Sequence, residues 1–269
     1  MNRFTLYALA WFGGGALVLL LTPQAGWWVL LPLWVAGFAG LALWGVFSIR
    51  AGLFVKSMNR LPAGHHLVAL TFDDGPDPRA TPALLDLLAR RRVPATFFCR
   101  GDRAQAHPEL IRRLDQEGHL VGSHTMHHHW WHNFLAGRAL EREIIAGQEA
   151  VGRALGRLPR LYRPPMGQTN PHLPRVVRQH GLVVVGWEVR PLDRRAPARQ
   201  VVRRVLRRVR DGSFILLHDG GVDPAHLVAV VEGVLDGLAA RGLGCCRADY
   251  WLKEPAFAPL PGEKAADAA

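Results

Sequence analysis

Cysteine is scarce in this chain of 269 residues, which contains only three. Cys99 stands at the end of an apolar run, and Cys245 and Cys246 are adjacent in the sequence. This spacing fits neither a thiolate zinc site nor a disulfide framework, so both are excluded. We therefore expect the three cysteines to be buried packing residues.

Charge is nearly absent from the first fifty residues. Residues 4–21 and 27–49 are two uncharged runs, each about one membrane span long, and only the short turn 22–26 separates them. No small-residue cleavage site follows the first run. The second run is too long and apolar for the buried helix that would follow a cleaved signal peptide. The sequence predicts a hairpin of two transmembrane helices within residues 1–50.

Acidic residues are too few to balance the basic ones, and the formal net charge is +11. Such a surface favours anionic neighbours, such as phospholipid head groups or phosphate-bearing envelope polymers. No nucleic-acid-binding motif accompanies the charge, so nucleic acid is not an expected partner, and no protein partner is indicated. One group of arginines recurs at helical spacing, and we expect it to be the solvated face of an amphipathic helix: Arg203, Arg204, Arg207, Arg208 and Arg210.

Beyond residue 50, short apolar segments typical of strands alternate with amphipathic segments typical of helices. Repeated strand–helix units predict an α/β fold with a parallel sheet and helices outside it. We expect residues 51–65 to be a basic linker and residues 66–254 to be the α/β domain. Residues 255–269 are rich in alanine, proline and charge, and we expect a disordered tail there.

Two adjacent carboxylates, Asp73 and Asp74, end one of the apolar runs and precede a Gly-Pro turn. Neighbouring carboxylates raise each other's pKa unless a cation lies between them. A division of roles, with one metal ligand and one base, therefore suits the pair. His124 and His128 stand four residues apart, and both rings can converge on one ion from a helix or a tight loop.

Two further segments, Arg163-Pro164-Pro165 and Leu216–Asp219, complete a set that resembles the motifs of the polysaccharide deacetylase family in their family order. This family is also called the NodB-homology group or carbohydrate esterase family 4. The resemblance covers about residues 66–250. It implies a distorted, incomplete TIM-like (β/α) barrel, here preceded by the transmembrane hairpin. In barrel enzymes the site lies at the carboxyl ends of the strands, which is where these motifs fall.

The resemblance implies a divalent metal held by Asp74, His124 and His128. One carboxylate with two imidazoles suits zinc, with cobalt, nickel or manganese as alternatives. Asp73 then matches the family's general base, and Arg163 matches the arginine that orients that base. Three nearby histidines have no matching role and are expected to be solvent-facing or packing residues: His127, His129 and His132.

The remaining family roles fall on four residues. His218 matches the general acid that protonates the departing amine, and Asp193 matches the carboxylate that keeps this acid protonated and aligned. Met166 stands where the family places a backbone N–H donor for the oxyanion, a role that does not depend on the side chain. Leu216 matches the residue that lines the pocket for the acyl methyl group.

The fourth family motif is altered here. Its usual first aspartate is replaced by Arg190 and its final tryptophan by Arg194. Catalytic competence is not excluded, because Asp193 survives. The loss of the tryptophan removes an apolar wall of the site, and the two added cations point to a phosphate-bearing or otherwise anionic substrate.

The sequence thus predicts a membrane-anchored, metal-dependent hydrolase that removes the N-acetyl group from N-acetylated amino sugars of a cell-envelope polysaccharide. One alternative is a deacylase or deformylase of a lipid-linked amino sugar. Another is a catalytically impaired deacetylase fold that binds glycans. The expected partners are an N-acylated glycan or lipid-linked amino sugar, and membrane lipids.

The sequence gives two answers on membrane sidedness. Arg3 precedes the hairpin, and Arg50, Lys56 and Arg60 follow it, so the positive-inside rule places the α/β domain in the cytoplasm. The family resemblance favours the outer side, where most members act on envelope polysaccharides.

Overall fold

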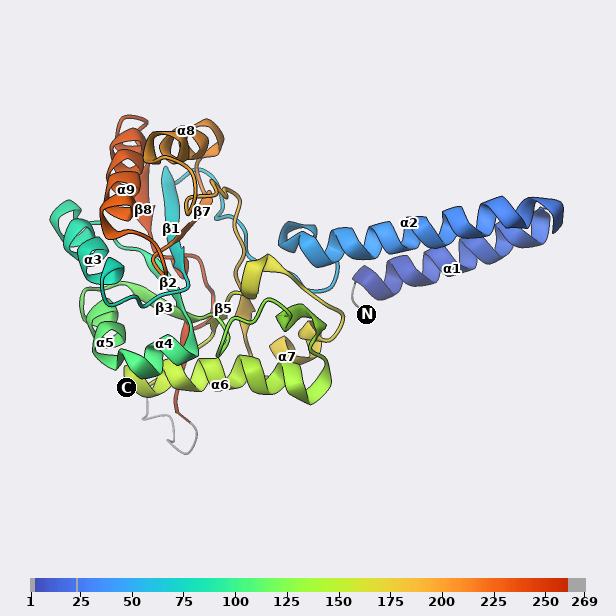
Figure 1. Ribbon diagram of the computed structural model, residues 1–269, viewed down its shortest axis with the longest axis horizontal. Helices are drawn as coiled ribbons and strands as arrows, with labels where there is room; N and C mark the ends of the chain where they lie inside the picture. The colour runs from blue at the N-terminus through green and yellow to red at the C-terminus, as the bar shows by residue number, and fades with distance from the viewer. Residues whose placement is uncertain (1–2, 23, 261–269) are drawn as a thin grey trace.

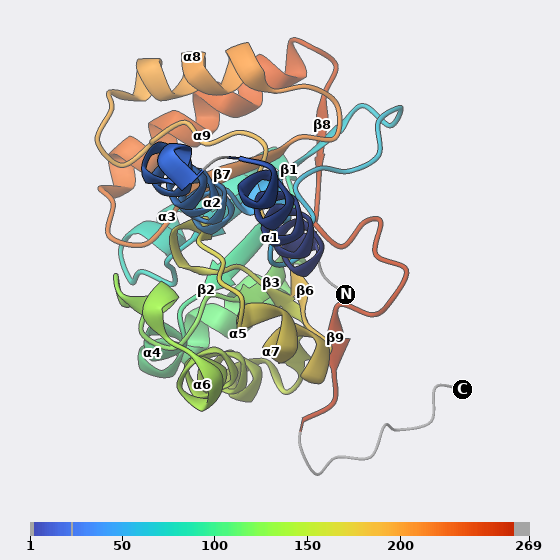
Figure 2. The same ribbon diagram turned by 90° about the vertical axis from the view of Figure 1, so that its right-hand side faces the viewer.

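The structure is a computed structural model that describes residues 3–22 and 24–260. An α/β domain carries a helical hairpin that projects from one side (Figure 1). The hairpin consists of α1 (Arg3–Leu21) and α2 (Trp27–Phe47), joined through the short 3-10 helix η1 (Gln24–Gly26). By length and composition both helices can cross a membrane. Figure 2, which looks along the hairpin, shows it in front of the strands.

Seven strands form one sheet in which every pairing is parallel. Their order is β6-β5-β3-β2-β1-β7, and β8 also pairs with β1. Isolated parallel bridges join Met58 to Val185 and Val189 to Ile215 near the open edges. The predicted incomplete barrel is thereby confirmed. The strands are β1 (Leu67–Asp73), β2 (Thr96–Cys99), β3 (Leu120–Ser123), β5 (Leu161–Tyr162), β6 (Val183–Val184), β7 (Phe214–His218) and β8 (Gly244–Cys246).

Helices surround the strands, as Figure 1 shows. Each buries an apolar face against the sheet. In α3, for example, Leu84 and Leu88 are fully buried in the same cluster as Phe72 of β1. Burial of such side chains supplies about 1.5–3 kcal/mol each and fixes the helices to the strands. The helices are α3 (Ala80–Arg91), α4 (Gly101–Ala106), α5 (Pro108–Gln116), α6 (Gly137–Leu155), α7 (Leu173–Gln179), α8 (Ala198–Arg208) and α9 (Pro224–Ala239).

The end of the hairpin is joined directly to the α/β domain. The backbone N–H of Thr169 donates to the carbonyl of Val46 over 3.0 Å, and its hydroxyl donates to the carbonyl of Gly45 over 2.9 Å. Ile49, two residues beyond α2, is buried in an apolar cluster of the domain. The last turn of α2 is therefore held against the segment that precedes α7.

Parts of the structure differ from the sequence-based expectations. Beyond β6 the carbonyls of Val185 and Gly186 accept hydrogen bonds from Arg163 instead of from a neighbouring strand. The expected linker 51–65 buries Val55 and Leu61 in apolar clusters of the domain, while Leu53 packs beside Gly45 of α2 and Phe54 packs on Phe4 of α1.

The first part of the expected disordered tail is ordered. Phe257–Ala258 forms β9, which pairs antiparallel with β4 (Leu158–Pro159). The rest of that tail, 261–269, lies outside the described residues. All three cysteines are free thiols; Cys99 and Cys246 are buried as expected, and Cys245 is half-buried.

Candidate active site

The predicted site residues meet at the carboxyl ends of the strands. Asp73 ends β1 and His218 ends β7, and the sheet register pairs them directly. His124 follows β3, and Arg163 follows β5. A cavity of about 660 Å³ opens here, and Arg163 is fully buried behind it. The cavity is lined by the other eight predicted residues: Asp73, Asp74, His124, His128, Met166, Asp193, Leu216 and His218.

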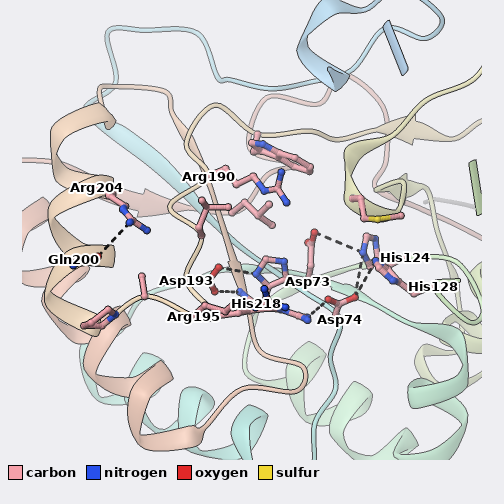
Figure 3. Close-up of a pocket in the computed structure, with 17 residues that line it drawn as sticks. Asp73, Asp74, His124, His128, Arg190, Asp193, Arg195, Gln200, Arg204 and His218 are labelled. Atoms are coloured by element: carbon pink, nitrogen blue, oxygen red, sulfur yellow. Dashed lines mark hydrogen bonds and ion pairs between the residues drawn. The ribbon is translucent and has the colours of Figure 1, made fainter. Parts of the chain in front are cut away.

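Asp74, His124 and His128 form a compact triangle on one side of this cavity (Figure 3). Asp74 Oδ1 lies 3.6 Å from His124 Nε2 and 3.5 Å from His128 Nε2. The carbonyl of Arg163 accepts a hydrogen bond from His124 Nδ1 over 2.7 Å. Because a carbonyl only accepts, the proton of a neutral ring sits on Nδ1, and Nε2 keeps its lone pair toward the triangle.

Unusual backbone geometry brings these three ligand atoms together. Asp74 has a φ of 71° and His128 a φ of 53°, and Thr125 in the same tight loop has a φ of 63°. Such angles cost a non-glycine residue of order 1 kcal/mol and gather at functional sites. Gly220 lies against this turn, where a Cβ would come within 2.1 Å of the carbonyl oxygen of Asp74. Only glycine fits there without displacing Asp74.

The donor set of the triangle suits a divalent cation. Asp74 Oδ1 is buried and has no hydrogen-bond partner among the described residues, so it is an acceptor without a donor. Burial, with the neighbouring His124, lowers the pKa of His128 to about 4, so its ring is neutral at physiological pH and can act as a ligand. Burial alone would raise the pKa of Asp74, but His124, His128 and Arg194 outweigh it and lower that pKa. One carboxylate oxygen and two imidazole nitrogens therefore point to one place, which is a donor set typical of zinc.

One carboxylate oxygen of Asp73 is held by the buried Arg163. Arg163 Nη1 donates to Asp73 Oδ1 over 2.6 Å and to the hydroxyl of Thr71 over 2.8 Å. The other two guanidinium nitrogens, Nε and Nη2, donate to the carbonyls of Val185 and Gly186. Each nitrogen of this buried cation therefore has a hydrogen-bond acceptor. Asp73 Oδ2 stays 3.9 Å from His124 Nε2, next to the triangle.

His218 and Asp193 form a second hydrogen-bonded pair on the other side of the cavity (Figure 3). His218 Nδ1 donates to Asp193 Oδ1 over 2.9 Å, and its backbone N–H donates to Oδ2 over 2.8 Å. Burial would lower the pKa of His218, but the hydrogen bond and charge of Asp193 outweigh it and raise that pKa. His226 of α9 donates to the carbonyl of Asp193 over 2.9 Å and fixes the backbone of this residue.

The apolar wall of the cavity is formed by Leu216, Met166 and Trp187. Met166 lies in the 3-10 helix η4 (Pro165–Gly167) with a φ of 55°. Trp187 covers this turn so closely that a Cβ on Gly167 would lie 2.2 Å from its ring. Leu216 and Trp187 belong to the apolar cluster that contains Ile49, so this wall continues to the end of the hairpin.

The family model described as polysaccharide deacetylase matches residues 60–185. A peptidoglycan-N-acetylglucosamine deacetylase of Bacillus cereus is 36% identical over 185 residues, which is 68% of this chain and 86% of that protein. The chain belongs to the polysaccharide deacetylase family. The predicted family is confirmed, and the protein is a hydrolase of carbon–nitrogen bonds other than peptide bonds.

Two further members support the assignment. A chitooligosaccharide deacetylase of Sinorhizobium fredii is 40% identical over 169 residues, covering 62% of this chain and 78% of that protein. The crystal structure of a peptidoglycan N-acetylglucosamine deacetylase superposes with a TM-score of 0.69 at 29% identity, covering 74% of this chain and 93% of that one.

Several contacts of this polysaccharide deacetylase site were not predicted. Trp187 lines the cavity, and Arg194 pairs with Asp74 Oδ2 and donates to the carbonyl of Gly220 over 3.1 Å. Arg204 was expected on a solvated helix face but lines the cavity, whereas Arg203, Arg207 and Arg208 of the same helix are exposed. The spacing of the arginines in the sequence does not indicate which of them lines the cavity.

Asp219 packs against the turn after β1, where a Cβ on Gly75 would lie 2.2 Å from Asp219 Oδ2. It is buried, and its Oδ2 accepts a hydrogen bond from Thr81 over 2.6 Å. Burial raises the pKa of Asp219 to about 7, assisted by the charges of Asp74 and Asp73 and opposed by the Thr81 hydrogen bond. Asp219 therefore packs against the turn after β1 and is held there by Thr81 of α3.

The three additional histidines lie outside the triangle. His132 is buried, and its Nε2 is 3.4 Å from the hydroxyl of Tyr162; burial lowers the pKa of His132 to about 3. His127 is exposed and bonded to Glu143, and His129 stacks on Trp131 with ring centroids 4.4 Å apart. Each occupies a packing or surface position.

Proposed function

We propose that this protein is a membrane-anchored, metal-dependent deacetylase of N-acetylated amino sugars in a cell-envelope glycan. One observation carries the proposal: a ligand triangle, an arginine-held carboxylate and an aspartate-held imidazole converge on one cavity. The deacetylase names of the peptidoglycan and chitooligosaccharide relatives support the substrate class.

Asp74, His124 and His128 are the proposed metal ligands, with zinc as the preferred ion and cobalt, nickel or manganese as alternatives. A divalent ion held there supplies positive charge that polarises an amide carbonyl and acidifies water. The hydrogen bond from His124 Nδ1 to the carbonyl of Arg163 orients one ring, and the tight loop around Thr125 orients the other.

Asp73 is the proposed general base. Because Arg163 holds one carboxylate oxygen, the other is free to accept a proton from the attacking water. The water oxygen forms a bond to the acyl carbon, and the carbonyl oxygen becomes an oxyanion. The backbone N–H of Met166 is the proposed donor to that oxyanion, while Leu216 packs against the acyl methyl group.

His218 is the proposed general acid. The hydrogen bond and charge of Asp193 raise the pKa of His218, which favours the protonated ring, and Asp193 also fixes its orientation. When the carbon–nitrogen bond breaks, the imidazolium gives its proton to the sugar nitrogen, since an amide anion is too poor a leaving group. Acetate and a free amino sugar are the products.

The two N-terminal helices are proposed as membrane spans. Their length, their composition and the exposure of their apolar side chains support this assignment. Because α2 is bonded to the domain through Thr169, the cavity would be held at a fixed place relative to the bilayer.

The decisive test is acetate release by the purified full-length protein from chitooligosaccharides and peptidoglycan fragments, with and without added zinc. Metal-dependent release supports the proposal, and no release from a broad panel of N-acetylated glycans with any of the four metals contradicts it. The ion pair between Arg194 and Asp74 favours one other candidate, a glycan-binding protein without turnover. Glycan binding without acetate release would support that candidate.

A further inference from the structure

Three arginines line the cavity opposite the ligand triangle: Arg190, Arg195 and Arg204. We call them the arginine wall. Figure 3 shows Arg204 on the far side of the cavity from His124 and His128, with Asp193 and His218 between them. Arg190 and Arg195 lie in the loop after Trp187, and Arg204 lies on helix α8. Both segments border the same cavity.

The charges of the arginine wall are not neutralised within the described residues. The cavity carboxylates already have partners: Asp73 pairs with Arg163, Asp74 with Arg194, and Asp193 with His218. None of the ion pairs of the described residues includes Arg190, Arg195 or Arg204. Three arginine side chains thus line one cavity without an anionic partner among the described residues, an arrangement that attracts a ligand carrying negative charge.

Contacts hold two of these side chains in place. Arg204 Nη1 donates to the carbonyl of Pro191 over 3.0 Å, which ties α8 to the loop. The guanidinium of Arg190 lies 5.8 Å from the ring centroid of Trp187. Leu192 in the same loop has a φ of 60°, a strained angle for a branched residue, and its side chain is exposed at the cavity. The loop therefore has a strained shape and places Arg190 at the cavity, while α8 places Arg204 there.

We propose that the arginine wall binds a phosphoryl group of the substrate, so that the preferred substrate is an N-acyl amino sugar that carries a phosphate. Arginine is the side chain best suited to this contact, because its planar fork donates two parallel hydrogen bonds to phosphate oxygens. The proposal rests on the proposed deacetylase function and specifies its substrate class.

Two sources can supply this chemistry: a lipid-linked sugar phosphate in the membrane and a phosphate-bearing glycan outside it. The apolar cluster that contains Trp187 and Leu216 of the cavity also contains Ile49, just beyond α2, so the cavity lies close to the end of the hairpin and its position favours a lipid-linked source. The experiment below contains an arm for each source.

The test compares acetate release by the full-length protein in detergent micelles from neutral chitotetraose and from N-acetylglucosamine 1-phosphate. It is repeated with Arg190→Gln, Arg195→Gln, Arg204→Gln and the triple variant. Arg208→Gln is the matched control, because Arg208 also lies on α8 and is exposed outside the cavity. We expect the ratio of kcat/KM on the phosphorylated sugar to that on the neutral one to fall about tenfold or more in the triple variant, the size of a lost charge-assisted contact. Arg208→Gln should keep the wild-type ratio.

A binding measurement tests the phosphate site without requiring that the protein turn over its substrate. In the Asp73→Asn background, calorimetry should give tighter binding of N-acetylglucosamine 1-phosphate than of N-acetylglucosamine, and the triple variant should lose that preference. Equal ratios and equal affinities in wild type and triple variant would overturn the phosphate site while the deacetylase proposal stands. Absence of acetate release from every sugar, with the binding preference intact, would overturn the deacetylase proposal alone.

The final arm separates the sources. N-acetylglucosamine linked through phosphate to a polyisoprenyl chain is compared in micelles with N-acetylglucosamine 1-phosphate and with a phosphate-bearing envelope glycan. A higher kcat/KM for the lipid-linked sugar assigns the lipid source, and a higher value for the glycan assigns the polymer. If neutral chitotetraose exceeds all three, the phosphate proposal is wrong.

Discussion

Arg163 Nη1 and Asp73 Oδ1 are 2.6 Å apart, and the arginine side chain is completely shielded from solvent. The same guanidinium donates to Thr71, Val185 and Gly186, so the pair belongs to a hydrogen-bond network that links β1 to the segment after β6. Asp73 therefore has a fixed position and keeps one carboxylate oxygen for chemistry.

Replacing Asp73 with asparagine should abolish turnover while sparing metal binding. The amide cannot accept a proton from water, and general-base catalysis contributes about 10²–10⁴ in rate. Acetate release measures turnover, and the metal content of the dialysed protein measures binding. Asp86→Asn is a matched control on the surface of α3 and should keep full activity. Retained activity in the Asp73 variant would remove this residue as the base.

Replacing Arg163 with alanine should destabilise the α/β domain. The change leaves the Asp73 carboxylate and two carbonyls buried without a partner, and breaking a buried pair in this way costs about 3–5 kcal/mol. Thermal unfolding in detergent, followed by circular dichroism, provides the measurement. Arg113→Ala breaks only exposed ion pairs and should cost about 0–1 kcal/mol. Equal decreases in unfolding temperature for both variants would contradict a stabilising role of the Arg163 network.

Replacing Asp193 with asparagine should shift the alkaline limb of the pH–rate profile to lower pH. Activity requires protonated His218 and is lost as the pH rises through its pKa. Asp193 raises that pKa through its hydrogen bond and charge, so the loss of the charge lowers it. The profile of kcat against pH for both proteins gives the result. An alkaline limb that stays in place would show that another group supplies the proton.

Replacing Arg194 with glutamine should tighten metal binding. Its guanidinium pairs with Asp74 Oδ2 and places a positive charge beside the ligand triangle, so it competes with a cation. The arginine side chain is 43% exposed, which limits the pair to about 1 kcal/mol, or about fivefold in the dissociation constant for zinc. Competition with a chelator measures this constant. Weaker zinc binding in the variant would mean that Arg194 positions Asp74 for the metal.

The full-length protein should stay in the membrane fraction after carbonate washing, because two apolar helices partition into the hydrocarbon core. A chain that starts at Ser48 keeps Ile49 and its packing in the domain, and it should be released to the soluble fraction. Extraction of the full-length protein by carbonate would contradict the spanning hairpin.

The positions of the strand-end residues were predictable because parallel strands place their carboxyl ends at one edge. Asp73 and His218, which are 145 positions apart, become direct neighbours through the register of β1 and β7. The spacing of His124 and His128 likewise indicated a shared target.

Other features depend on contacts that a linear pattern does not contain. Arg194 reaches Asp74 across 120 positions, and Arg204 differs from its neighbours only in the direction that α8 gives it. These outcomes are decided by tertiary packing, which overrides local propensity.

The hydrogen bond between Thr169 and the carbonyl of Val46 has a consequence for which sugars are within reach. With α2 embedded in a bilayer, it keeps the cavity mouth at a constant height above the lipid head groups. A sugar is then chosen first by how close it stands to the membrane plane and only afterwards by its chemistry. If α1 and α2 span a membrane as proposed, strands of a distant envelope layer lie beyond the reach of the anchored domain.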